Sequence, residues 1–235
     1  MKLGISISVI SIALLLSSCV KDNSGNQTPL VKDIVIDGNC TINFTYDQQN
    51  RLIQMSQCDT METFQYSGDS VIDIKTAGGI LSYKYIYLLG PKGLAKGYMK
   101  VGGDGSIANY VFAYDASGHR LSTTDTLHVN TADNYTIQNN DVILEVSNSS
   151  LTGDNFSIST IFYAGTRNTL SNANFGLTFL GQSSANLKKA DSYNYAQGGQ
   201  YTVTYTFSLD DNNGVSRQIS RINGVVTDSR TYDYY

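Results

Sequence analysis

The chain contains few of the residues that build helices and reactive sites. Its 235 residues include no tryptophan and only two prolines, two histidines and three cysteines. Glu62 and Glu145 are its only glutamates, so nearly all of its acidic residues are aspartates. Aspartate favours turns, in which it hydrogen-bonds nearby backbone, whereas glutamate favours helices. The composition therefore argues against a helical protein, and two isolated histidines argue against a metal site.

The charge balance is mildly acidic. Sixteen lysines and arginines stand against twenty aspartates and glutamates, which gives a formal net charge of −4. A protein that binds nucleic acid needs a basic patch to neutralise phosphates, so we expect no nucleic-acid partner. The sequence also lacks a phosphate-cradling glycine loop and a Gly-x-Ser-x-Gly nucleophile motif. We therefore expect no cofactor and no enzymatic activity.

The N-terminal residues have the organisation of a bacterial lipoprotein signal peptide. Lys2 precedes an apolar run, Ile5 to Leu16, that is too short for a bilayer span of about 20 residues. The following Ser-Ser-Cys19 completes a lipobox, the site that lipoprotein signal peptidase cleaves before a lipidated cysteine. We predict a signal peptide over 1–18, lipidated Cys19, a polar tether over 19–32 and a single domain over 33–235. The predicted product is an outer-membrane lipoprotein that faces the periplasm or the cell surface.

The rest of the chain has the composition of strands and tight turns. It holds 17 tyrosines and 21 glycines, and the segment 41–46, TINFTY, strictly alternates polar and apolar residues. Turn-forming Gly, Asn and Asp separate similar segments along the chain, and strand alternation lapses only within Thr169 to Leu180. We predict an all-β fold with little helix. It would be an antiparallel meander of roughly 12–16 short strands, forming a rolled sheet or a barrel-like structure.

One phrase occurs twice, as FTYDQQNRL at 44–52 and FAYDASGHRL at 112–121. Both read as hairpin corners in which an aspartate opens the turn, while Asn50 and Gly118 occupy a left-handed position. A weaker third copy lies at 210–214. In the second copy His119 precedes Arg120, which predicts a longer loop. The phrase is a structural unit rather than a site.

These corners resemble the YD repeat of long β-sheet proteins. Together with the lipobox, the motif FLGQSSANL at 179–187 and YTVTYTF at 201–207, they resemble a Bacteroidetes lipoprotein family of unknown function. The resemblance covers about residues 35–225. It implies a porin-superfamily-like β fold, with a meandering sheet rolled toward a barrel, and it implies no activity.

Cys40 and Cys58 flank the first corner and are the candidate disulfide of an oxidising envelope compartment. With a three-residue loop, Tyr46 faces Leu52, and the cysteines come opposite one another at about 4.5 Å between Cα atoms. With a four-residue loop the apolar residues match better, but the cysteines point to opposite faces. A β-bulge at the corner would reconcile the two registers.

Tyrosines supply the candidate binding surface. Tyr83, Tyr85 and Tyr87 share one face of their strand, and Tyr201 and Tyr205 share one face of another. A tyrosine ring suits sugar and protein recognition alike, but the same rows would also form an ordinary core. The preferred function is a lipid-anchored, non-enzymatic module that binds a glycan, a protein or an envelope component. A structural accessory without a small ligand is the alternative, and a polysaccharide-acting enzyme is the least favoured.

Three Asp-Ser/Thr-aliphatic triplets resemble O-glycosylation acceptors of the same bacterial group. They place the candidate acceptors at Thr60, Ser70 and Thr126. Asp-Ser and Asp-Thr are also ordinary turn pairs, so both interpretations stand at this stage.

Overall fold

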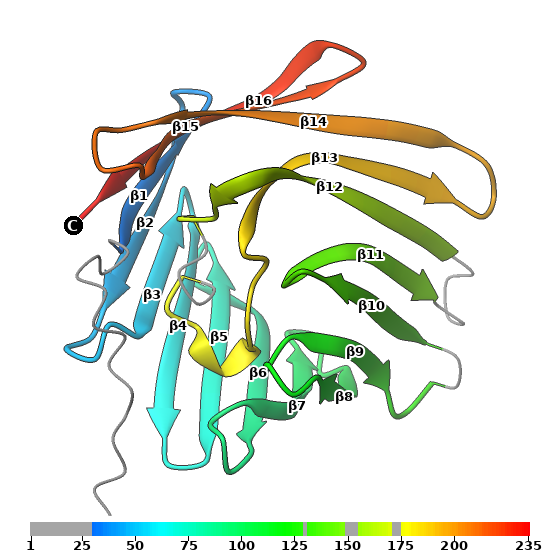
Figure 1. Ribbon diagram of the computed structural model, residues 1–235. Helices are drawn as coiled ribbons and strands as arrows, with labels where there is room; N and C mark the ends of the chain where they lie inside the picture. The colour runs from blue at the N-terminus through cyan, green and yellow to red at the C-terminus, as the bar shows by residue number, and fades with distance from the viewer. Residues whose placement is uncertain (1–29, 129–130, 149–154, 171–174) are drawn as a thin grey trace, which may run out of the picture.

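The computed structural model describes residues 30–128, 131–148, 155–170 and 175–235, and within them sixteen antiparallel strands form a closed barrel (Figure 1). Each strand pairs with its neighbours in the sequence, and β1 closes the barrel against β16. The predicted all-β meander is therefore confirmed, and it closes fully. The predicted signal peptide, Cys19 and the predicted tether up to residue 29 lie outside the described residues.

The strands are short. They are β1 (Val31–Ile36), β2 (Cys40–Tyr46), β3 (Leu52–Gln57), β4 (Thr60–Ser67), β5 (Ser70–Ala77), β6 (Ile80–Leu89), β7 (Ala95–Gly102), β8 (Ile107–Tyr114), β9 (Arg120–Asp125), β10 (Ala132–Gln138), β11 (Asp141–Asn148), β12 (Asn155–Arg167), β13 (Asn186–Tyr195), β14 (Gln200–Leu209), β15 (Val215–Ile222) and β16 (Val225–Tyr234). The 3₁₀ turn η1 (Thr178–Leu180) falls within the stretch where strand alternation lapses.

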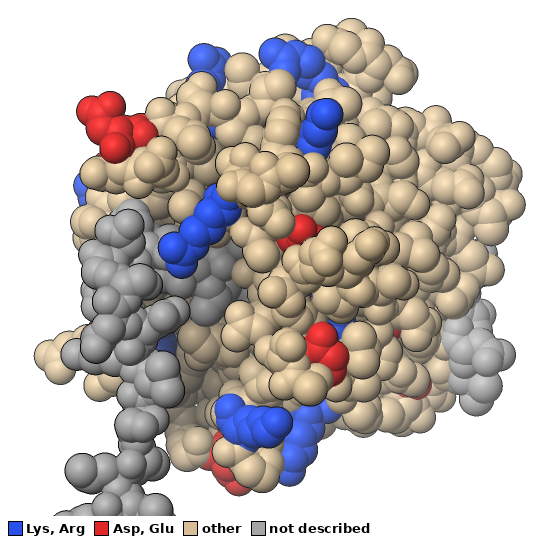
Figure 2. Space-filling view, in the orientation of Figure 1, with Lys and Arg blue, Asp and Glu red and all other residues tan. Residues whose placement is uncertain are grey.

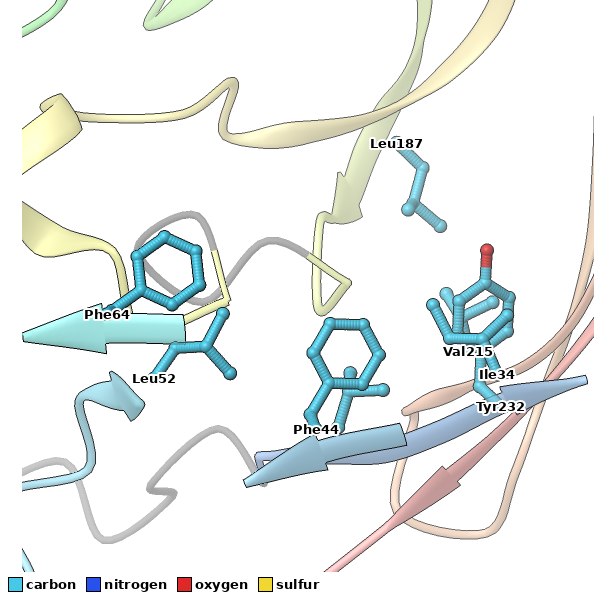
Figure 3. Packing of buried hydrophobic residues seen from close by; sticks show 8 residues of the cluster. Ile34, Phe44, Leu52, Phe64, Leu187, Val215 and Tyr232 are labelled. Atoms are coloured by element: carbon cyan, nitrogen blue, oxygen red, sulfur yellow. The ribbon is translucent and has the colours of Figure 1, made fainter. Parts of the chain in front are cut away.

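Alternation along the strands separates an inner from an outer face. In β2, Phe44 is buried while Thr41, Asn43 and Thr45 are exposed, as the sequence pattern predicts. The buried apolar residues form two clusters, one around Phe179 and one shown in part in Figure 3: Val31, Ile34, Phe44, Leu52, Phe64, Leu187, Val215 and Tyr232. Strands that are far apart in the chain thus share one cluster.

The repeated phrase forms hairpin corners of one type. The Asp47 carboxylate accepts hydrogen bonds from the backbone N–H groups of Gln49 and Arg51, at 2.9 and 3.0 Å. Asp210 accepts equivalent bonds in the third copy. Asn50 has φ +61° and Gly118 has φ +91°, so both adopt the predicted left-handed conformation.

The expectation of a longer second loop is wrong. The Asp115 backbone N–H donates to the His119 carbonyl at 2.9 Å, just as Asp47 donates to Arg51 in the first copy. His119 therefore takes the place of Arg51, and Arg120 moves into the strand position that Leu52 fills. The loop keeps three residues because the buried His119 ring replaces the arginine instead of being inserted before it.

The described parts of the connection between β12 and β13, residues 168–170 and 175–185, lie at one end of the barrel and contact its hairpin corners. Its Thr169 hydroxyl accepts a bond from the Val215 N–H at the β14–β15 corner. Phe175 stacks on Phe44 with ring centroids 5.3 Å apart. Farther along, the Gln182 backbone N–H donates to the Gly118 carbonyl, and the Ala185 backbone N–H donates to the Asn140 carbonyl. We call residues 168–170 and 175–185 the end segment, because they lie at the end where each even-numbered strand leads into the next odd-numbered strand.

Aromatic packing holds the middle of the end segment inside the barrel. Phe179 of η1 is 2% exposed, and its ring lies 4.9 Å from that of Tyr87 in β6 and 6.2 Å from that of Tyr66 in β4. Figure 1 shows η1, in yellow, overlapping β4 to β6 in that view. The motif 179–187 therefore belongs to the segment that closes the barrel.

The structure joins Cys40 and Cys58 in a disulfide, with Cα atoms 6.2 Å apart. The strand pairing predicted for a three-residue loop is present at the corner, where Tyr46 faces Leu52. Farther out Phe44 faces Met55, so Ile53 is the extra residue of a bulge. The bulge moves the cysteines off a directly opposite position, which explains a Cα separation larger than the expected 4.5 Å.

We predict that this bond forms in the mature protein. Thiol counting on unfolded, unreduced protein carrying Cys19→Ser should find no free thiol, and reduction should release two. The same protein with Cys40→Ser would show one free thiol and serves as the calibration. Two thiols in the unreduced protein would contradict the assignment.

Candidate functional site

The barrel interior next to the end segment contains a cavity of about 330 Å3. Its walls come from the end segment, from the start of β13 and from β14 and β15. The lining residues are Asn168, Leu170, Ser183, Ser184, Leu187, Lys188, Tyr205, Phe207 and Gln218. The volume lies near the lower end of the range for small-ligand pockets, about 300–1,000 Å3.

One wall of the cavity is apolar and aromatic. Leu187 is among the most buried side chains of the barrel, and Leu170 and Phe207 pack against the same cluster. Tyr163 lies edge-on to Phe207, with ring centroids 6.2 Å apart, and fixes the orientation of that ring. This wall offers a flat surface of the kind that stacks against an apolar ligand face.

The other wall is organised around Asp191, which is 2% exposed. Its carboxylate accepts hydrogen bonds from the Thr160 hydroxyl at 2.6 Å, the Tyr205 hydroxyl at 2.9 Å and the Lys188 ammonium at 3.1 Å. Burial, followed by the Asp191 charge, raises the pKa of Tyr205, so this hydroxyl remains a donor at physiological pH. The buried carboxylate thus positions the Lys188 and Tyr205 side chains that line the cavity.

Amide and hydroxyl groups complete the polar lining. The Asn168 amide donates to the Ser184 carbonyl at 3.1 Å, and the Ser184 hydroxyl accepts the Val142 N–H at 3.0 Å. The Gln218 side-chain oxygen accepts the Tyr232 hydroxyl at 2.9 Å. These bonds hold neutral polar groups in place around the cavity, an arrangement suited to a ligand with hydroxyl groups.

A second aromatic wall lies on β6–β8. Tyr85 is in edge contact with Tyr98, with centroids 5.1 Å apart, and Tyr98 stacks on Tyr110 at 4.7 Å. The Lys100 ammonium lies 5.7 Å from the centre of the Tyr83 ring and 5.8 Å from that of Tyr85. This spacing is within the range of a cation–π contact.

An acid pair lies beside this wall. Asp73 is 3% exposed, and its Oδ1 atom has no hydrogen-bond partner among the described residues. Burial, reinforced by the Glu62 carboxylate, raises the pKa of Asp73 to about 8. Glu62 is also 3.9 Å from the Lys75 ammonium. Asp73 therefore holds a proton at neutral pH that an exposed aspartate would have released.

The predicted tyrosines all lie on the inner face but do not form one surface. Tyr83, Tyr85 and Tyr87 belong to the β6–β8 wall, where Tyr87 is a core residue packed on Phe179. Tyr201 stacks on Tyr193 of β13, with ring centroids 4.6 Å apart and planes inclined by 10°. Tyr205 alone among the five lines the cavity.

Sequence reasoning missed the other cavity residues. Ser183, Ser184 and Leu187 belong to the motif 179–187 and Phe207 ends the motif 201–207, so these two motifs were the available signals. Lys188, Phe207 and Gln218 follow ordinary strand alternation, which marks them as inner or outer but does not show that they converge.

The candidate glycosylation residues lie in or beside hairpin turns. Thr60 donates its hydroxyl bond to the Gln57 carbonyl at 2.8 Å, and Ser70 donates to Ser67 at 3.1 Å. Thr126 is exposed and donates to Asn109 at 3.2 Å. These bonds show how the hydroxyls serve the turns, and glycosylation of the three residues stays a prediction.

Each histidine is paired with an aspartate near it in the chain. His128 Nδ1 lies 2.8 Å from the Asp125 carboxylate, and His119 Nδ1 lies 3.4 Å from that of Asp115. Among the described residues, no group of three or more His, Cys, Asp or Glu side chains is placed to hold a metal ion. His128 thus has a hydrogen-bonded partner, whereas the buried His119 Nδ1 atom makes no hydrogen bond among the described residues.

The fold is a closed antiparallel meander barrel, and solved structures with this architecture are described as porin-like proteins. One, from Bacteroides uniformis ATCC 8492, aligns with a TM-score of 0.67 at 15% identity over 87% of this chain and 98% of its own. Another, from Bacteroides vulgatus ATCC 8482, aligns with a TM-score of 0.61 at 14% identity over 88% and 99%. At this identity the likeness shows the fold alone. No protein-family model and no curated protein sequence matches the chain, so lipoprotein family membership and the YD repeat stay predictions.

On the face shown in Figure 2, basic and acidic side chains are scattered and form no continuous patch of one sign. No helix in the described part of the chain is long and apolar enough to cross a membrane.

Proposed function

We propose that this protein is a lipid-anchored envelope protein whose barrel binds a small polyhydroxylated ligand, a sugar, in the cavity beside the end segment. The cavity itself carries the proposal, because it places an aromatic wall opposite several fixed amide and hydroxyl groups. A sugar ring has the same two-sided character, since its C–H face is apolar and its hydroxyls need donors and acceptors.

An enzymatic role is less well supported. A glycosidase places two carboxyl groups about 5–9.5 Å apart, with the sugar bond between them. The Glu62 carboxylate instead acts on Asp73 and, after burial, raises its pKa, so the two acids lie together on one side of the barrel interior. The Asp191 carboxylate is already engaged by three donors. We therefore favour binding over catalysis.

Tyrosine fluorescence can test the proposal, because the chain contains 17 tyrosines and no tryptophan. Titration with neutral, amino and acidic monosaccharides should give a saturable signal for at least one class. Lys188→Met should weaken that binding about tenfold, because a charged hydrogen bond contributes roughly 1.5–3 kcal/mol. Lys84→Met, on the outer face of β6, is the matched control and should leave the affinity unchanged.

Two results would reject the sugar site. A protein that binds none of the sugars would favour the structural or assembly role. Binding that Lys188→Met leaves unchanged would place the ligand elsewhere, and the β6–β8 tyrosine wall would be the next region to mutate.

The outer wall supports an anchored rather than a spanning protein. Membrane-spanning strands need about 9–11 residues and an apolar outer band. Here β1, β3 and β9 have six residues each. The outward-facing residues of β16 include Thr227, Ser229, Thr231 and Asp233. An apolar band around the whole barrel, which a spanning protein needs, is therefore interrupted at β16.

Attachment through Cys19 gives a direct prediction. Wild-type protein should fractionate with membranes, and Cys19→Ala should appear in the soluble fraction, because the variant has no cysteine for the acyl chains. Cys40→Ala is the control and should remain in the membrane fraction. Unchanged membrane association of Cys19→Ala would rule out this anchor.

A further inference from the structure

One sector of the outer wall of the barrel is more apolar than the wall at β14. On β5 to β8 the outward-facing residues, which alternate with the buried inner ones, are mostly aliphatic: Ile72, Ile74, Ile86, Leu88, Met99, Val101, Ile107 and Val111. We call these residues the aliphatic sector. The outward residues of β14 include instead Thr204, Thr206 and Ser208.

The aliphatic sector is substantially exposed. Leu88 is 59% exposed, Ile107 55% and Val111 49%. The side chains lie on four adjacent strands, so they form one continuous surface rather than scattered single residues. Apolar surfaces of this kind on one side of a protein mark interaction sites.

A groove of about 420 Å3 crosses the aliphatic sector at Gly97. A Cβ atom at Gly97 would collide with the backbone of Tyr110 and Val111, so this position requires glycine. Leu88, Met99 and Val111 border the groove. It is therefore a depression built into an apolar surface, large enough to receive a hydrocarbon group.

The charged side chains within the aliphatic sector are basic. Lys84 faces outward within it, and Lys96 lines the groove. The outward-facing residues of β5 to β8 include no acid, and the nearby aspartates, Asp69 and Asp104, lie in hairpin turns at the ends of the strands. An aliphatic surface with lysines fits a membrane that contains anionic lipid.

The predicted tether is long enough to let the aliphatic sector reach the membrane in which the acyl chains of Cys19 would insert. Cys19 lies eleven residues before Leu30, which immediately precedes β1. Eleven extended residues span up to roughly 36–40 Å. β7 is six strands from β1 around the barrel, about 29 Å at 4.8 Å per strand.

We propose that the aliphatic sector rests on the membrane surface to which Cys19 anchors the chain, and that lipid hydrocarbon fills the groove at Gly97. The barrel then lies with one wall against the lipid and its Thr- and Ser-rich wall toward water. The contact is independent of the proposed sugar cavity, which is inside the barrel.

Vesicle co-sedimentation tests this contact without the anchor. The mature chain with Cys19→Ser should bind vesicles of phosphatidylethanolamine and phosphatidylglycerol, and more weakly phosphatidylcholine alone. The double variant Leu88→Asp/Val111→Asp should reduce binding about tenfold, because charged groups are excluded from the apolar layer. Thr204→Asp/Thr206→Asp on the opposite wall is the matched control and should bind like the parent chain.

Circular dichroism and the melting temperature would establish that each variant is folded. No binding to either vesicle, or equal binding by both double variants, would overturn the proposal. A stable dimer in light scattering that Leu88→Asp/Val111→Asp dissociates would also overturn it, since the sector would then be an interface between two copies.

Discussion

Replacing Phe179 by alanine is expected to lower the free energy of unfolding by about 3–5 kcal/mol, the usual cost of removing a buried phenylalanine. Phe179 is 2% exposed and packs against Tyr66 and Tyr87, which come from two different strands. Its ring thus connects the end segment to the wall of the barrel. Without it, the segment would lose its central apolar contact and leave a void between β4 and β6.

Urea denaturation followed by circular dichroism would measure the change. Phe156→Ala is a matched control, because Phe156 is only partly buried, near the far end of the barrel, and its ring contacts Tyr195 at 5.9 Å. It should cost about 1 kcal/mol, since little apolar surface is involved. If Phe179→Ala cost no more than this control, the end segment would not be part of the barrel core.

Replacing Asp73 by asparagine is expected to stabilise the protein at pH 8 by about 5 kcal/mol and to have little effect near pH 4. Because burial and Glu62 raise the pKa of Asp73 to about 8, the folded protein keeps a proton that the unfolded chain releases above about pH 4. Stability of the wild type should therefore fall as the pH rises from 4 to 8, by at most about 1.4 kcal/mol per pH unit. Above pH 8 both states are ionised and the loss should level off.

Asparagine removes this dependence because it has no proton to release. Melting temperatures of wild type and Asp73→Asn between pH 4 and 9 would show the difference, with Asp69→Asn in an exposed turn as the control. Glu62→Gln should give part of the same effect, since the Glu62 charge contributes to the raised pKa. Parallel curves for wild type and Asp73→Asn would show that Asp73 is ionised in the folded protein.

Local chemistry made the corners predictable. Asp47 and Asp210 bond backbone N–H groups two and four residues ahead, and Asn50 takes the left-handed position, all within one turn. The alternation of β2 also follows directly from its residues, because a strand places every second side chain on the same face. These features need no information from elsewhere in the chain.

By itself, therefore, the sequence determined the all-β meander, the type of corner and the two candidate cysteines. Closure of the barrel was decided by the tertiary structure, because the same alternation suits an open sheet until β1 meets β16 at the other end of the chain. The bulge at Ile53, the contacts of the end segment and the convergence of Lys188, Phe207 and Gln218 were likewise decided by the tertiary structure. Each depends on contacts between residues far apart in the chain, which neither turn chemistry nor strand periodicity specifies.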